Sequence, residues 1–119
     1  MNAKTMSAQG PTLLIRANCI GRGDDELGLN LMMNFIFHLT KAETVPETII
    51  LMNSGVTLAS EGSEVLDELR ELERRGTSVL VCGTCLNFFN IKDQLKAGHV
   101  SNMGEIATTL LDASKVITV

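Results

Sequence analysis

Two cysteines with the spacing Cys-X-X-Cys, Cys82 and Cys85, follow an apolar run that ends at Val81. The run is typical of a strand and the residues after the pair are typical of a helix, so both thiols are predicted at a strand-to-helix turn. Free backbone N–H groups and the positive end of a helix dipole stabilise a thiolate there and lower its pKa. A thiol in that position can act as a nucleophile or carry sulfur as a persulfide, with the second thiol resolving or protecting it.

Other uses of such a pair fit the chain less well. A structural zinc site would need Cys19 with His38 or His99, and their spacing does not suggest one, so neither a metal nor a cofactor is expected. A thioredoxin-type site needs a proline facing the disulfide, and the chain has none after Pro46. Two ordinary buried cysteines are the structural alternative, because free cysteine is often a small core residue.

The elements that must position the thiols alternate between strands and helices. Strands are expected at 13–15, 48–52, 77–81 and 115–119. Helices are expected at 27–39, between Ser60 and Gly76 with Ser60 or Ser63 as the cap, and after Asn102, which caps the last one. A broken helical stretch follows the cysteine pair, and His99 after it is expected in a loop. This order predicts an α/β fold in which a parallel sheet with right-handed crossovers has helices on both faces.

Ligands of open parallel sheets bind beyond the carboxyl ends of the strands. Three loops, 18–28, 53–60 and 82–87, are expected to meet at that edge. Cys82 and Cys85 are the candidate catalytic residues there. The candidate anion- or substrate-binding residues are Cys19, Arg22, Asn53, Ser54, Gly55, Thr84 and Asn87.

The loop from Asn18 to Gly28 has two glycines with the spacing of a dinucleotide fingerprint, but the match fails in detail. Glu26 stands where the third glycine should be, and acidic residues occupy the place of a pyrophosphate. Asp24 or Asp25 is expected instead to cap the following helix. Arg22 either steers an anion towards the rim or pairs with these acids.

The segment 27–39 carries more apolar residues than one buried helix face requires. Its polar positions, Asn30, Asn34 and His38, lie on a single stripe. We interpret the excess as a homo-oligomer interface, and a loop or the N-terminal arm covering the helix is the alternative.

Composition narrows the function classes. The 119 residues carry a formal net charge of −4, with scattered basic residues and no Trp or Tyr, so no nucleic-acid partner is expected. The longest apolar stretch is too short for a membrane span. The odd count of three cysteines and the lack of a signal-peptide pattern favour a reducing cytoplasm. Residues 1–11 are expected to be a disordered lead-in, and residues 12–119 a single domain.

Three ordered stretches resemble the DsrE/DsrF-like family of sulfur-handling proteins. They are the loop 21–28, the segments 53–56 and 61–66, and above all 82–87, whose sequence is Cys-Gly-Thr-Cys-Leu-Asn. Within the family the chain is most similar to the C-terminal domain of YedF proteins, which are linked to selenium metabolism.

The resemblance implies a three-layer α/β/α domain with a mostly parallel, roughly five-stranded sheet, assembled into dimers, trimers or hexamers. It implies that Cys82 accepts persulfide sulfur from a small carrier protein and that Cys85 resolves or supports it. YedF-type chains begin with a carrier-like domain bearing a Cys-Pro motif, which this chain lacks. A sulfur-carrier protein acting in trans is therefore the expected partner.

Three functions remain open from the sequence. The first is a sulfurtransferase-like carrier of sulfur or selenium that uses the cysteine pair. The second is a non-catalytic oligomeric module that binds a small anion or metabolite through Ser54, Gly55, Thr57 and backbone N–H groups. The third is a thiol redox sensor based on a Cys82–Cys85 disulfide.

Overall fold

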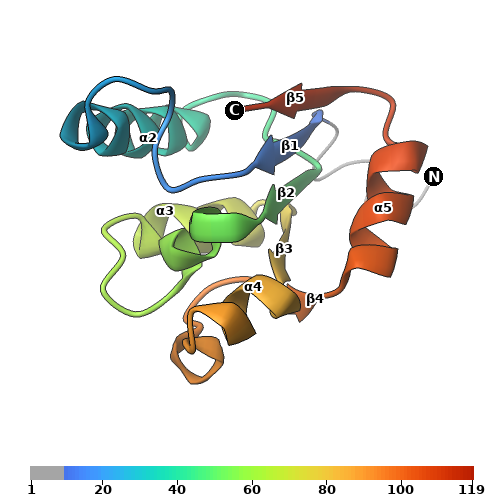
Figure 1. Ribbon diagram of the computed structural model, residues 1–119. Coiled ribbons are helices and arrows are strands. Elements are labelled where there is room, and N and C mark those ends of the chain that lie inside the picture. The colour runs from blue at the N-terminus through green and yellow to red at the C-terminus, as the bar shows by residue number, and fades with distance from the viewer. Residues whose placement is uncertain (1–9) are drawn as a thin grey trace.

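A five-stranded, all-parallel sheet forms the centre of the computed structural model, which describes residues 10–119 (Figure 1). Its spatial order is β4-β3-β2-β1-β5. The strands are β1 (Thr12–Ile15), β2 (Thr48–Leu51), β3 (Ser78–Cys82), β4 (His99–Ser101) and β5 (Val116–Thr118). The parallel α/β architecture predicted from the sequence is confirmed.

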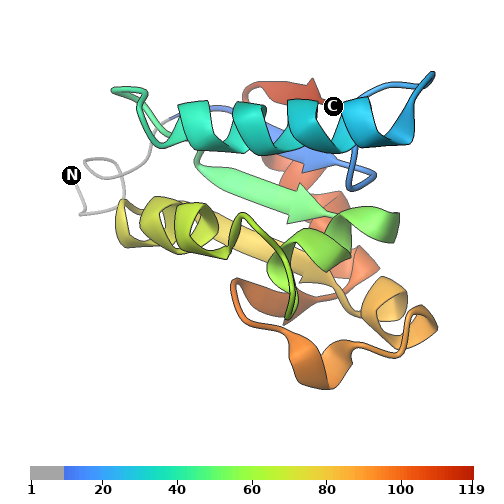
Figure 2. The ribbon, with the colours of Figure 1, turned by 90° about the vertical axis from the view of Figure 1, so that its left-hand side faces the viewer.

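Helices cover both faces of the sheet. Helix α2 (Asp25–Leu39) and helix α3 (Leu66–Arg74) lie on one face, and helix α5 (Met103–Asp112) lies on the other, as the two perpendicular views show (Figures 1 and 2). Within residues 10–119, none of the helices combines the length and the apolar character needed to cross a bilayer.

Two of the three helix caps predicted from the sequence are confirmed. Asp24 accepts a hydrogen bond from the Leu27 N–H at 2.8 Å, and Asn102 accepts one from the Glu105 N–H at 2.9 Å. The prediction that Ser60 or Ser63 caps α3 is wrong: Val65 occupies that position, and no side chain caps the helix.

The end of α3 is tied to the end of α2. The Arg75 guanidinium donates to the carbonyl oxygens of Thr40, at 3.0 Å, and of Ala42, at 2.9 Å. Charged donors to the last carbonyls of a helix satisfy groups that the helix itself cannot bond. Arg75 is therefore a link between two elements, and the residue that pairs with Glu71 is Arg74.

Two short helices lie at the edge where the strands end. A 3-10 helix, η1 (Asn53–Ala59), follows β2, and α4 (Gly83–Phe88) follows β3. A second 3-10 helix, η2 (Lys92–Gln94), precedes β4. The segment from Asn53 to Ser60, expected as a loop, is thus mostly helical, and it meets α4 at the edge predicted to hold the site.

Strand β4 does not follow from the residue pattern. It has only three residues, two of them exposed, because it is an edge strand that pairs with β3 alone. His99, expected in a loop, is its first residue.

The N-terminal lead-in was expected to end at Pro11, and residues 1–9 of that expectation lie outside the described residues. Gly10 and Pro11 belong to the fold: the Gly10 N–H donates to the Val45 carbonyl, and the Pro11 carbonyl accepts from the Glu47 N–H. Gly10 and Pro11 are thus bonded to the domain that was expected to begin at residue 12.

Candidate functional site

Cys82 is the last residue of β3 and is only 2% exposed. The strand runs one residue further than the sequence predicted, so this thiol belongs to the sheet. Cys82 pairs with Ser101 of β4, and Gly83 begins α4 directly afterwards. A Cβ on Gly83 would lie 3.0 Å from the Ser101 carbonyl oxygen, so this turn passes close to β4. The first cysteine of the pair is therefore a buried thiol.

Cys85 lies on α4, one turn further along, and is partly exposed. Its Sγ accepts a hydrogen bond from the backbone N–H of Asn53 at 3.1 Å. The donor comes from the start of η1, after β2, and the acceptor comes from the helix after β3. Two of the three loops predicted to meet at this edge are thus joined at the accessible sulfur atom.

The pKa of Cys85 is raised above that of an ordinary cysteine. Burial is the main cause, and the neighbouring Cys82 side chain raises the pKa further, while the Asn53 N–H lowers it. The expectation of a thiol with a lowered pKa is therefore wrong for Cys85. Loss of solvation at the thiolate outweighs the one backbone donor that favours it. Cys85 is held mainly as the neutral thiol at neutral pH.

Asn53 adopts a left-handed conformation, with a φ of 51°. Such a φ is uncommon for residues other than glycine, and asparagine tolerates it better than most. The conformation occurs where β2 passes into η1, at the residue whose N–H points to the Cys85 sulfur. The backbone at Asn53 thus accepts an unfavourable geometry at the point where it contacts the thiol.

Ser54 and Gly55 join the same loop to the end of β1. The Ser54 hydroxyl accepts from the Asn18 N–H at 3.0 Å and donates to the Asn18 side-chain oxygen at 3.3 Å. A Cβ on Gly55 would lie 2.8 Å from the Ile15 carbonyl oxygen, so only glycine lets η1 pass this close to β1. Ser54 and Gly55 thus hold η1 against the end of β1, and the Ser54 hydroxyl is bonded to other atoms of the protein.

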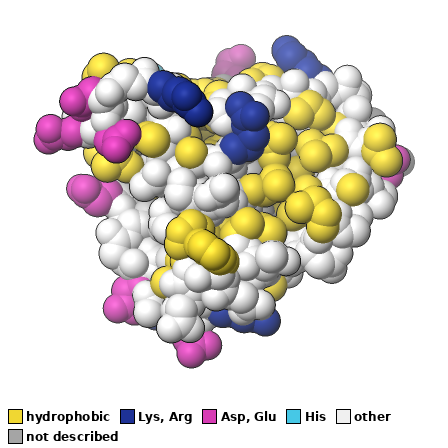
Figure 3. Space-filling model, viewed as in Figure 1, with side chains coloured by type: hydrophobic (Ala, Val, Ile, Leu, Met, Phe, Trp, Pro, Cys, Tyr) yellow, Lys and Arg dark blue, Asp and Glu magenta, His cyan; other side chains and the backbone are white. Residues whose placement is uncertain are grey.

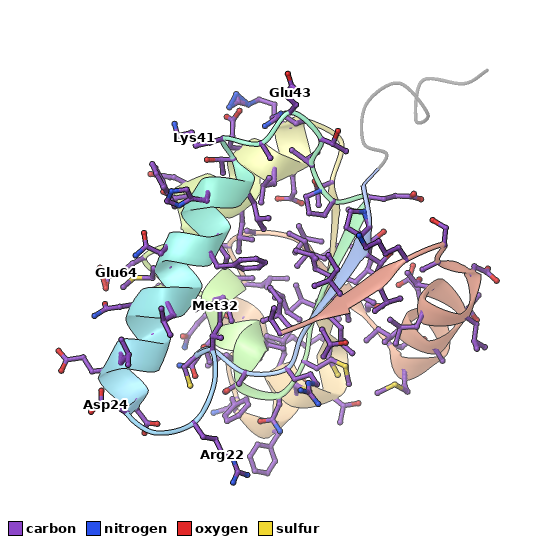
Figure 4. All side chains as sticks on the ribbon, turned by 90° about the horizontal axis from the view of Figure 1, so that it is seen from above. Arg22, Asp24, Met32, Lys41, Glu43 and Glu64 are labelled. Carbon is purple, nitrogen blue, oxygen red and sulfur yellow. The ribbon has the colours of Figure 1, made fainter. Side chains whose placement is uncertain are left out.

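Four other candidates lie apart from this contact. Cys19 packs against α2, where a Cβ on Gly28 would come within 2.7 Å of its own Cβ. Arg22 is exposed and extends away from the fold (Figure 4), and it forms no ion pair within residues 10–119. Thr84 and Asn87 are exposed on α4. Of the predicted site residues, the structure brings together Cys82, Cys85 and Asn53. None of the cysteines Cys19, Cys82 and Cys85 forms a disulfide.

Two neighbours of the site did not emerge from the sequence as functional candidates. Asn18 fixes Ser54, and its position just after β1 was the available signal. Phe88, on the same helix as Cys85, is 82% exposed and stacks edge-on against Phe89. An exposed aromatic ring beside an accessible thiol is a candidate contact for a partner protein.

In Figure 3, apolar side chains gather over the side formed by β5 and α5 in the view of Figure 1.

The described residues contain no group of three metal-binding side chains arranged to hold an ion. The site itself offers one accessible sulfur, one buried sulfur beside it, and one backbone donor.

A model of the DsrE/DsrF-like family matches residues 4–119 of the chain. The ychN protein from E. coli has a similar structure, with a TM-score of 0.69 and 19% identity over 93% of this chain and all of that one. MTH1491 from Methanobacterium thermoautotrophicum, described as a protein of unknown function, has a TM-score of 0.64 and 21% identity over 91% and 96%. No match was found among curated proteins. At such identities the structural likeness shows the fold.

Proposed function

This chain belongs to the DsrE/DsrF-like family, and on that premise we propose that it carries sulfane sulfur as a persulfide on Cys85, with Cys82 as the resolving thiol. The observation that carries the proposal is the contact between Cys85 and Asn53. It places a partly exposed sulfur atom under a backbone donor, with a second thiol adjacent. Sulfur relay is the chemistry generally linked to the family.

The roles within the pair are assigned from burial. Cys82, which the family resemblance favours as acceptor, has almost no surface that a donor could reach. Cys85 is accessible and is therefore the thiol that attacks. Thiolates, not thiols, are the nucleophiles in such exchanges. Because the pKa of Cys85 is raised, transfer should be slow at neutral pH and accelerate as the pH rises.

In the proposed step, the Cys85 thiol loses its proton to solvent and its thiolate attacks the terminal sulfur of a donor persulfide. The S–S bond of the donor breaks, the donor leaves as a thiolate, and Cys85 becomes a persulfide. Attack of the Cys82 thiolate on the Cys85 Sγ then forms a Cys82–Cys85 disulfide and releases the carried sulfur as hydrosulfide. Two thiols are oxidised and one sulfane sulfur is reduced, so the electrons balance.

A sulfur-carrier protein acting in trans is the proposed donor. The exposed Phe88 ring, on the same short helix as Cys85, supplies an apolar contact for it. A selenopersulfide donor (R–S–SeH) would deliver selenium by the same steps: the Cys85 thiolate attacks the terminal selenium, and the donor leaves as a thiolate. The selenium version of the proposal is motivated by the similarity of the sequence to YedF proteins, which are linked to selenium metabolism.

The test is intact mass after incubation with inorganic polysulfide, before and after reductant, with a parallel arm of selenite plus glutathione, whose thiols reduce the selenite to a glutathione selenopersulfide donor. Addition of one sulfur atom, removed by reductant, supports the carrier. Loss of two hydrogens in the wild type is expected both of a carrier that has released its sulfur and of a redox pair, so the Cys82→Ser variant decides between them: one added sulfur atom on this variant supports the carrier, and an unchanged mass identifies a redox pair. An unchanged mass of the wild type rules out both and leaves a binding module, in which the 18–28 and 53–60 loops hold a small anion.

A further inference from the structure

A groove runs between α2 and the segment from η1 to α3, on the face of the sheet opposite α5. Two adjoining cavities of about 470 and 450 Å³ form it, and they share Asn30, Met33, Glu64 and Val65 as lining residues. We call this feature the α2–α3 groove. In Figure 4, Glu64 lies beside α2 along this groove.

One wall of the groove is apolar. Leu29, Met33 and Phe37 of α2 line it at successive turns. Leu29 and Phe37 remain 38% and 43% exposed, although both are large hydrophobic side chains. This stripe differs from the sheet-facing residues of the same helix, Met32 and Ile36, which are fully buried. The groove thus presents apolar surface that the described part of the chain covers only at Phe37, where the Lys41 ammonium lies over the ring.

The charged residues of the groove all have the same sign. Glu26, Glu61, Glu64 and Glu68 line it, and no Lys or Arg does. Within residues 10–119, only Glu61 of the four forms an ion pair, with Lys96 at 3.8 Å.

We propose that the α2–α3 groove binds an amphipathic helical segment of a partner protein, with apolar residues on one side and Lys or Arg on the flanks. A helix lying in a groove between two helices buries an apolar stripe, and complementary charge guides its association. From Glu26 to Phe37 the groove spans about 16 Å, or roughly three helical turns. The Phe37 ring already accepts an ammonium group: the Lys41 Nζ lies 5.0 Å from its centroid.

A second copy of this chain is a poorer occupant. In a two-fold dimer the same surface faces itself, which would bring the glutamates of both copies together. Like charges in that arrangement oppose association. At its other end the groove reaches Asn18, which holds Ser54 next to the Asn53–Cys85 contact. A helix bound there would lie near the thiol edge of the sheet.

The test uses the full chain and a fluorescein-labelled peptide of about three helical turns, with Leu at i, i+3, i+4 and i+7 and Lys elsewhere. Fluorescence anisotropy should show saturable binding that weakens as salt rises. The double variant Glu64→Lys with Glu68→Lys should weaken binding about tenfold or more. Glu43→Lys with Asp93→Lys is the matched control, because Glu43 (Figure 4) and Asp93 are exposed outside the groove and their reversal should have little effect.

The apolar wall is tested separately with Phe37→Ser, which should weaken binding at every salt concentration, against Leu111→Ser on α5 as control. Circular dichroism of each variant verifies folding. Equal affinity for a peptide with Glu in place of Lys would overturn the proposal. So would equal effects of reversal at Glu43 and Asp93 and of reversal in the groove, or a change of sedimentation coefficient in the Glu64→Lys, Glu68→Lys variant that reveals a second copy there. None of these measurements depends on persulfide chemistry.

Discussion

The backbone N–H of Asn53 donates to the Sγ of Cys85 across 3.1 Å, although the two residues are 32 positions apart in the chain. Asn53 is left-handed at this point, and its N–H is the one influence that lowers the pKa of Cys85. The contact couples a backbone conformation to the ionisation of a thiol. Substitutions that disturb this contact should therefore change the pKa of Cys85 in a known direction.

Asn53→Val should raise the pKa of Cys85, because a β-branched residue disfavours the left-handed conformation and displaces the donor. The rate of Cys85 alkylation by iodoacetamide, followed against pH, should shift to higher pH. Asn53→Gly keeps the conformation accessible and should restore the profile.

Asn90→Val is a matched control, because Asn90 is also left-handed, with a φ of 58°, but forms no hydrogen bond to the Cys85 sulfur. Both valine variants should lose about 1–2 kcal/mol of stability. If the two valine variants shift the alkylation profile equally, the Asn53 contact does not control the thiol.

Cys82→Ala should lower the pKa of Cys85. The Cys82 side chain raises that pKa by its hydrogen bond and its charge, and alanine removes both. Since a lower pKa gives more thiolate at a given pH, Cys85 should be alkylated faster near neutrality and the profile should move to lower pH. Cys19→Ala is the control, and its Cys85 profile should match that of the wild type. A Cys82→Ala profile displaced to higher pH would contradict the assignment.

Gly55→Ala should destabilise the fold by about 1–3 kcal/mol, as overpacking does. The added Cβ would lie 2.8 Å from the Ile15 carbonyl oxygen, and neither backbone segment can move away without loosening η1. Urea denaturation measures the change. At Gly104 the nearest heavy atom is the capping oxygen of Asn102, at 3.1 Å, which has to shift by only a few tenths of an ångström, so Gly104→Ala should cost less. Equal costs would show that the close approach of η1 to β1 is not tight.

Leu31→Asp should dissociate a homo-oligomer formed through α2. Leu27 and Leu31 lie on the side of this helix away from the α2–α3 groove and are 56% and 43% exposed. Sedimentation velocity should show the wild type larger than one chain and the variant as a single chain. Leu111→Asp on α5, at an 85% exposed position, should leave the assembly intact. A wild type that sediments as a monomer would remove the proposed α2 interface.

The elements with strong hydrophobic periodicity could be predicted from the sequence, and so could two helix caps. Strand β4 could not, because a three-residue edge strand has no periodicity to detect; it exists through its pairing with β3. The role of Arg75 was also inaccessible, since its carbonyl partners at the end of α2 are distant in sequence.

At the site, sequence order placed the loops at the correct edge, and 53–60 and 82–87 do meet there. Which of the two cysteines is buried could not be predicted from the order of the elements in the sequence. Cys82 is both the last residue of β3 and the N-cap of α4, so it lies at the predicted strand-to-helix junction, but its side chain is buried and Cys85 is the thiol that solvent reaches. The raised pKa of Cys85 has the same origin, because desolvation depends on tertiary packing, whereas the expected helix-dipole effect is local.

The most direct test of the persulfide proposal is to locate the added sulfur after exposure to inorganic polysulfide, by alkylating and fragmenting the peptide that contains both cysteines. We predict the extra sulfur atom on Cys85 in Cys82→Ser, which cannot resolve the persulfide, the Cys82–Cys85 disulfide as its product in the wild type, and no added sulfur in Cys85→Ser. Persistent labelling of Cys85→Ser at Cys82, or no labelling of Cys82→Ser at any pH, would contradict the account.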